Sequence, residues 1–179
     1  MSLTSTGMSD GETHRAVQTS ADERLEARLD RLTRAVVQFA LGTADWPREA
    51  TLAVMEDGVF VRKGTGHEEL AALRLMTRTR LWRLDIPVAL VRPTTLKSYT
   101  TGDGKASKDQ MVAAVDERHG TELVKLPKSH GRYDQADALA LAAMGYHRVQ
   151  GQPLPQHFPA RPPYAPSLDV VAWPTLVSD

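Results

Sequence analysis

The hydrophobic positions along the chain follow two different periods, and together these predict alternating helices and strands. Spacings of three and four residues predict amphipathic helices at about 20–41 and 67–84. Short unbroken apolar runs at 51–55 and 86–91 are typical of strands that are covered on both faces. Helix followed by strand, twice over, indicates an α/β layer with some parallel pairing.

The amino-terminal segment has the pattern of a β-hairpin. Residues 1–7 are compatible with a strand, Asp10-Gly11 is a turn signal, and 14–19 is expected to be the return strand. The first of these strands is short, as though its beginning were missing.

The stretch from Asp134 to Met144 contains good helix formers and two carboxylates, Asp134 and Asp137. Their spacing of three residues places both on one helix face, and we expect both in the first turn, where the helix dipole favours anions. The remaining Ala, Leu and Met side chains suit close packing against a sheet. Two neighbouring carboxylates on a buried helix are a way to hold a divalent cation. An Asp N-cap followed by a first-turn Asp explains the same spacing without a metal.

A third acid, Glu56, directly follows the apolar run at 51–55. Sheets of α/β proteins bind their ligands at the carboxyl ends of strands, so Glu56 is a candidate to join the two aspartates. A strand-end Glu in solvent would have the same pattern.

Basic residues gather in the middle of a chain whose formal net charge is zero. From 58 to 108 we count ten Lys and Arg against four Asp and Glu, so this segment carries +6 and the remainder −6. Within it, Phe60 lies beside Arg62 and Lys63 in a glycine-bounded loop. Such a loop can approach distorted nucleic acid by stacking and by phosphate contacts, or Phe60 can fold back onto the core.

A glycine-rich turn at 99–106 precedes a helix expected at 107–118. The backbone of such a turn can approach a phosphate, and Lys97, Lys105 and Lys108 would neutralise its charge. It is not a Walker A loop, because alanine rather than Ser or Thr follows Lys105.

Composition limits the remaining classes. The chain has 179 residues, 41% of them hydrophobic, and no cysteine, which predicts one domain without disulfides or thiolate sites. No apolar run reaches membrane-spanning length and no signal-peptide pattern is present, so we expect a cytoplasmic protein with no membrane partner. Seven of the eleven prolines lie after residue 150. We therefore divide the chain into a domain at 1–149 and an extended proline-rich tail at 150–179, and take His119 and His130 as surface residues.

Two stretches, Pro93–Met111 and Asp134–Ala140, resemble the RuvC-like Holliday junction resolvases. That family shows Pro-x-x-x-Lys, Gly-x-Gly, Ala-x-Lys and Asp-x-x-Asp-Ala-Leu in this order. Met55-Glu56 matches the strand that ends in the family's catalytic Glu, and Ser2–Gly7 is similar to the segment after its first catalytic Asp.

The resemblance implies an RNase H-like α/β fold, with a five-stranded mixed sheet flanked by helices and, in this chain, a truncated first strand. It implies a homodimer that cuts four-way DNA junctions with two Mg²⁺ ions, or Mn²⁺ in their place. Glu56, Asp134 and Asp137 would be catalytic metal ligands, and Lys97 and Lys108 would contact the scissile phosphate. Lys105 and the Phe60 loop would contact DNA elsewhere.

One departure from the family pattern limits this interpretation. The first catalytic Asp would be the residue that precedes Met1, and Asp10 lies across the hairpin, so we expect weak or absent cleavage with DNA binding retained. Two alternatives stay open: a junction-binding protein without activity, and a nuclease of the same fold that acts on RNA or plain duplex.

Overall fold

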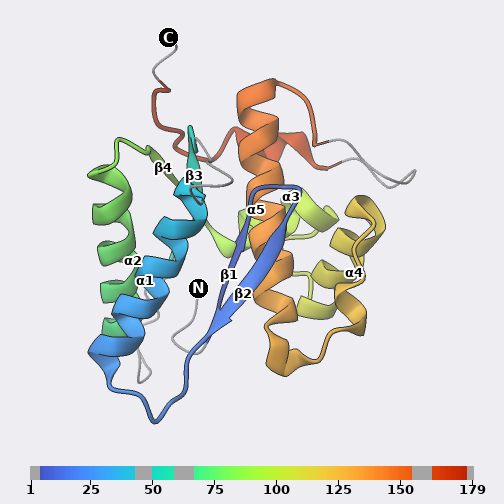
Figure 1. Cartoon of the computed structure of the whole chain (residues 1–179). Helices are drawn as coiled ribbons and strands as arrows, with labels where there is room; N and C mark the ends of the chain where they lie inside the picture. Colours follow the sequence, from blue (N-terminus) through green and yellow to red (C-terminus); the bar gives the residue numbers. More distant parts are fainter. Residues whose placement is uncertain (1–4, 43–49, 59–66, 155–162, 177–179) are drawn as a thin grey trace.

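The computed structural model describes residues 5–42, 50–58, 67–154 and 163–176. In this part of the chain, two helices pack on one side of the strands and a long central helix packs on the other, with two shorter helices beyond it (Figure 1). The helices of the first side are α1 (Leu25–Leu41) and α2 (His67–Trp82), and those of the second are α3 (Pro93–Thr101), α4 (Lys108–His119) and the central α5 (Arg132–Gln150).

The predicted hairpin is confirmed. β1 (Ser5–Ser9) pairs antiparallel with β2 (His14–Gln18), with Thr6 opposite Val17. Asp10 holds the turn, because its carboxylate accepts hydrogen bonds from the backbone amides of Glu12 at 3.0 Å and Thr13 at 2.7 Å. Because β1 runs two residues beyond the glycine at position 7, Asp10 stands directly at the end of this strand.

The two apolar runs form β3 (Ala53–Glu56) and β4 (Val88–Val91), which pair in parallel with Met55 opposite Leu90. This confirms the expected parallel pairing, and β3 ends at Glu56 as predicted. Over the residues that the structure describes, the strands form two separate two-stranded sheets, β1-β2 and β3-β4. A continuous five-stranded sheet is therefore not confirmed.

Helix α5 is the element against which both sheets pack, which confirms the prediction of a buried helix. Its small residues allow the close approach. A Cβ on Gly7 of β1 would lie 1.9 Å from the backbone oxygen of Asp134, and a Cβ on Gly145 of α5 would lie 2.8 Å from Cγ2 of Val54 in β3. The sequence pattern of small apolar residues thus sets how closely the strands approach the helix.

The start of α5 differs from the prediction. The helix begins at Arg132, after Gly131 at φ 69°, so Asp134 lies in the first turn without being the N-cap and Asp137 lies one turn further along. Glycine readily adopts this left-handed conformation, which turns the chain directly into the helix. The helix therefore begins two residues before Asp134, where the sequence pattern placed its start. The N-cap explanation of Asp134 is therefore wrong.

His119 is buried, with 7% of its surface exposed, so its assignment to the surface was wrong. It is the last residue of α4, and the chain folds back there through the left-handed residue Gly120. The helix α3 was also not predicted. It begins with Pro93 at its first position and is capped by Gly102, which are ordinary start and stop signals, and its last residues overlap the turn predicted at 99–106.

The described part of the tail packs on the domain. Val171 is buried in the main core, and the Tyr164 amide donates to the carbonyl of Tyr99 in α3 at 3.0 Å. A short helical turn, η3 (Ala165–Leu168), lies between these two contacts. None of the helices in the described segments combines the length and the apolar content that a bilayer crossing requires.

Candidate active site

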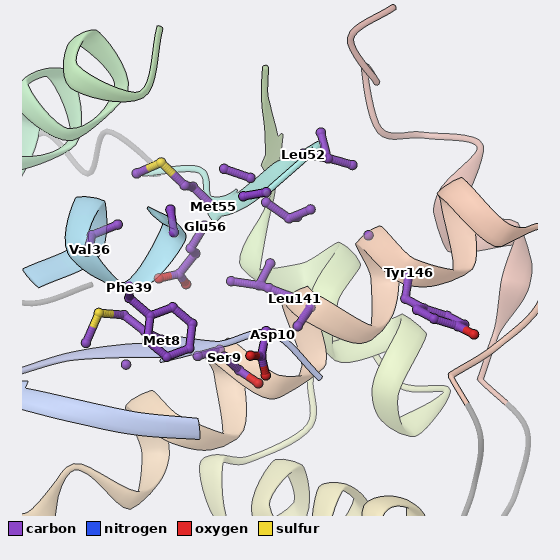
Figure 2. A pocket seen from close by; sticks show the side chains of 18 of the residues that line it. Met8, Ser9, Asp10, Val36, Phe39, Leu52, Met55, Glu56, Leu141 and Tyr146 are labelled. Atoms are coloured by element: carbon purple, nitrogen blue, oxygen red, sulfur yellow. The ribbon is translucent and has the colours of Figure 1, made fainter. Parts of the chain in front are cut away.

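A pocket of about 500 Å³ lies between the two sheets, with α5 and α1 as its other walls (Figure 2). Most of its lining is apolar, including Phe39 of α1 and Leu141 of α5. Its acidic lining residues are Asp10, Glu56, Asp134 and Asp137. The three acids predicted as metal ligands therefore line one pocket, although they come from a strand and a helix almost eighty positions apart.

Glu56 reaches the pocket because β3 ends there. The preceding residue, Met55, is buried in the core, so strand alternation turns the Glu56 side chain to the other face. In Figure 2 the side chain points from β3 toward β1, into the space between the sheets. On α5, Asp134 and Asp137 share one helix face and line the same pocket.

Charge crowding is visible at Asp137, whose pKa is raised to about 6. Burial of the carboxyl group is the largest cause, and the neighbouring carboxylates of Glu56 and Asp134 raise it further. Lys108 acts in the opposite direction and lowers this pKa. The acids thus interact electrostatically with one another and with one lysine.

The donor chemistry of this cluster suits a hard divalent cation, since all three side chains offer carboxylate oxygens. Within the described segments, however, no three His, Asp or Glu side chains stand close enough to enclose a metal ion. Asp10 also lines the pocket, but both of its carboxylate oxygens accept hydrogen bonds inside the hairpin turn. The acids share a pocket without forming a preformed cage.

The three predicted lysines differ in their relation to these acids. Lys108 is the first residue of α4, beside the capping box of Ser107 and Gln110, and its charge acts on Asp137. Lys105 is exposed in the preceding turn and Lys97 is half-buried on α3. None of the three lysines lines the pocket.

Comparison with known proteins identifies the family. A crossover junction endodeoxyribonuclease RuvC from Streptomyces avermitilis is 34% identical over 140 residues, which cover 76% of this chain and 72% of the relative. The chain belongs to the RuvC family. A RuvC from Parafrankia sp. is 31% identical over 157 residues, covering 85% of this chain and 79% of the relative. No protein-family model matches the sequence.

The fold of this RuvC-family chain is similar to that of Thermus thermophilus RuvC in complex with a Holliday junction substrate. The TM-score is 0.61 at 17% sequence identity, over 86% of this chain and 94% of the solved one. The RNase H-like α/β fold that the motifs predict is confirmed by this similarity.

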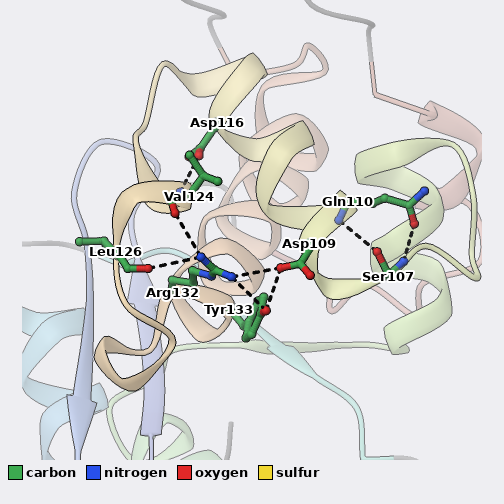
Figure 3. Close-up of polar contacts among 8 residues, drawn as sticks. All are labelled: Ser107, Asp109, Gln110, Asp116, Val124, Leu126, Arg132 and Tyr133. Atoms are coloured by element: carbon green, nitrogen blue, oxygen red, sulfur yellow. Dashed lines mark hydrogen bonds and ion pairs between the residues drawn. The ribbon is translucent and has the colours of Figure 1, made fainter.

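Sequence analysis missed a polar cluster that joins the starts of α4 and α5 (Figure 3). Arg132 donates to the carbonyl of Val124 at 3.1 Å and to Asp109 at 3.2 Å, and the Tyr133 hydroxyl donates to Asp109 at 2.8 Å. The Tyr133 hydrogen bond, followed by the positive charges nearby, lowers the pKa of Asp109. The ammonium of Lys108 lies 5.3 Å from the centre of the Tyr133 ring.

This cluster adjoins the acids of the pocket, because Tyr133 directly precedes Asp134 along the chain, and Lys108 lies over its tyrosine ring. No spacing in the sequence pointed to it, since Asp109 and Arg132 are twenty-three positions apart. The predicted DNA-contacting residues Phe60, Arg62 and Lys63 lie outside the described residues, so their role stays a prediction.

Proposed function

We propose that this chain is a metal-dependent, structure-selective endonuclease that hydrolyses phosphodiester bonds at four-way DNA junctions. The observation that supports this best is the meeting of Glu56, Asp134 and Asp137 at one pocket of a RuvC-family chain. The relatives' name and the junction-bound solved structure supply the substrate class.

Glu56, Asp134 and Asp137 would hold the metal. The raised pKa of Asp137 is consistent with this role. The carboxylates of Glu56 and Asp134 disfavour the ionised form of Asp137, and a bound cation would favour it. When bound, two Mg²⁺ ions, or Mn²⁺ in their place, supply the Lewis acidity for attack by water on the phosphorus. Small movements of β3 and α5 would be needed to bring the three acids together.

The lysines would neutralise the DNA backbone. Lys108 is the best candidate for the scissile phosphate, since its charge acts on Asp137 and its ammonium lies 5.3 Å from the centre of the Tyr133 ring. Lys97 and Lys105 would contact neighbouring phosphates along the turn at 99–106, and the Phe60 loop would contact the junction centre.

The family resemblance implies one further bridging Asp. Asp10 does not supply it in this structure, because both of its carboxylate oxygens accept hydrogen bonds in the hairpin turn. Binding of the junction would depend on the basic surface.

The test combines metal binding, junction binding and nicking. Wild type should bind Mn²⁺ in titration calorimetry, prefer a synthetic four-way junction over plain duplex and structured RNA, and nick the junction in Mg²⁺ or Mn²⁺ but not in Ca²⁺. Glu56→Gln and Asp137→Asn should lose Mn²⁺ binding and nicking. Asp169→Asn is the matched control, since this exposed aspartate lies outside the pocket.

Each result separates the hypotheses. Junction preference without nicking in any metal would favour a junction-binding protein without activity. Equal affinity for junction, duplex and RNA would reject structure selectivity. Unchanged Mn²⁺ binding in Asp137→Asn would remove Asp137 from the site.

A further inference from the structure

Three cationic side chains gather around the ring of Tyr133. The Arg132 guanidinium lies 5.0 Å from the ring centre, the Lys108 ammonium 5.3 Å and the Lys128 ammonium 5.7 Å. The face of a tyrosine ring carries negative charge density, so it attracts each of these cations. They come from the start of α4, the connection before α5 and the start of α5, so the ring joins positive charge from separate elements.

One carboxylate, Asp109, offsets part of this charge. It accepts hydrogen bonds from the Tyr133 hydroxyl at 2.8 Å and from Arg132 at 3.2 Å (Figure 3). Asp109 therefore neutralises Arg132 and holds the ring by its hydroxyl. Lys108 and Lys128 are exposed, and neither forms a salt bridge with a described residue. Two positive charges thus remain over the ring.

The connection that carries Lys128 is attached to α5 on both sides of this residue. Lys128 opens the short helical turn η2 (Lys128–His130). Before the turn, the Val124 carbonyl accepts a hydrogen bond from Arg132 of α5 at 3.1 Å. At the end of the turn, the His130 carbonyl accepts one from the buried Gln135 of α5 at 3.0 Å. The backbone beneath the Lys128 side chain is therefore held in place.

Exposed lysine side chains lose rotamer freedom when they bind an anion, and this loss weakens binding. Contact with the ring already restricts Lys108 and Lys128 before a ligand arrives, so less freedom is left to lose. A DNA strand carries one phosphate for about every 3.4 Å of helix axis, so two ammonium groups near one ring can meet two phosphates of one strand. Because Tyr133 directly precedes Asp134, these phosphates would lie beside the acid pocket.

We propose that Lys128 binds a DNA backbone phosphate next to the one assigned to Lys108, and that Tyr133 positions both lysines for these contacts. The ligand class is a run of phosphodiesters, which lysine binds as a point charge. The inference rests on the proposed function for the identity of the nucleic acid. It requires neither metal nor cleavage, so it is tested without them.

The test measures binding of the full chain to a fluorescent plain DNA duplex in EDTA over a series of NaCl concentrations. Each phosphate contact contributes about 0.9 to the slope of log affinity against log salt. Lys128→Ala should reduce the slope by about that amount and weaken binding about fivefold at low salt, as should Lys108→Ala. Lys125→Ala is the matched control, because this exposed lysine lies in the same connection, pairs with Glu122 and should leave the slope unchanged.

Tyr133 is tested by two substitutions, since it makes no phosphate contact of its own. Tyr133→Leu should weaken duplex binding at least about threefold with the salt slope of wild type, because both lysine charges remain. Tyr133→Phe keeps the ring and should bind like wild type. In NMR spectra without DNA, the ring current should shift the ε-methylene signals of Lys108 and Lys128. Tyr133→Phe should keep that shift and Tyr133→Leu should lose it.

Four results would overturn the inference. They are no binding of duplex at any salt concentration, an unchanged slope in Lys128→Ala, an equal loss of slope in Lys125→Ala, and lysine signals that Tyr133→Leu does not move. Failure of the nuclease function looks different. A chain that never nicks a junction, yet loses slope in Lys128→Ala, would retain this phosphate site and lose the proposed activity.

Discussion

Among the acids of the pocket, Asp137 is the one whose pKa is raised by its surroundings. Its carboxyl group is largely buried on a helix of small apolar residues, and two further acids raise its pKa to about 6. A group in this state destabilises the fold when it is ionised, and it is retained where that ionised form has a use. Burial and the neighbouring carboxylates therefore explain both the destabilisation by ionised Asp137 and its proposed function as a metal ligand.

The pH dependence of unfolding measures this cost. The folded pKa of about 6 lies above the ordinary value of 3.8, so the stabilisation is fully present below pH 4 and is lost as the pH rises through 6. We expect this group to lower the free energy of unfolding by about 2 kcal/mol between pH 4 and pH 7. In urea titrations, the free energy of unfolding of Asp137→Asn should not show this decrease between pH 4 and pH 7. Asp137→Asn should therefore be more stable than wild type at pH 7.

The control for this measurement is Asp169→Asn, whose stability profile should follow wild type. A second measurement uses Mg²⁺, which should raise the melting temperature of wild type and not that of Asp137→Asn. Parallel pH profiles for wild type and Asp137→Asn would contradict the assignment of the raised pKa.

Helix α5 contacts each of the two sheets closely at a glycine, and the two contacts are of different kinds. At Gly7 the opposing atom is a backbone oxygen of the helix, and at Gly145 it is the end of a valine side chain. Backbone atoms cannot move without shifting the whole element, whereas the end of a side chain can rotate away. The hairpin contact is therefore the less tolerant of the two.

Alanine at each glycine tests this difference. Gly7→Ala should destabilise the fold by about 3 kcal/mol or more, because its Cβ would overlap the Asp134 carbonyl. Gly145→Ala should change stability by less than about 1 kcal/mol, because the better helix propensity of alanine offsets the contact with Val54. Chemical denaturation of both variants measures the difference, and equal losses would show that the hairpin is not held against α5 as described.

At the scale of the whole molecule, α2 carries an apolar stripe on its outer face. Leu75 and Trp82 are 64% and 73% exposed, and their spacing of seven residues puts them on one side of the helix with Arg78 between them. Exposed aromatic, aliphatic and arginine side chains in one patch are typical of protein interfaces. We propose this face of α2 as the contact of the expected homodimer.

Light scattering tests the contact. Wild type should be a dimer, and Leu75→Glu should shift it toward monomer by burying a charge in the interface. Val170→Glu introduces the same charge at an exposed valine of the tail and should leave the dimer intact. A monomeric wild type at every concentration, or a dimer that Leu75→Glu does not weaken, would exclude this face.

Local patterns determined most of the elements of this protein. Turn residues and the alternation of apolar positions predicted the hairpin, both parallel strands and α5, since these depend on neighbours within a few residues. The motif order predicted the RuvC family. The buried His119 and the helix α3 were missed, because burial depends on distant segments and because the start and stop signals of α3 coincided with another motif.

The sequence by itself identified the family and predicted which residues carry the chemistry, three acids and a set of lysines. Only the tertiary structure decided that Glu56 and the α5 aspartates line one pocket, and that the Asp109–Arg132–Tyr133 cluster joins the starts of α4 and α5. The physical reason is range. Helix and strand signals act between near neighbours, whereas pockets and charge clusters arise where segments far apart in the chain pack together.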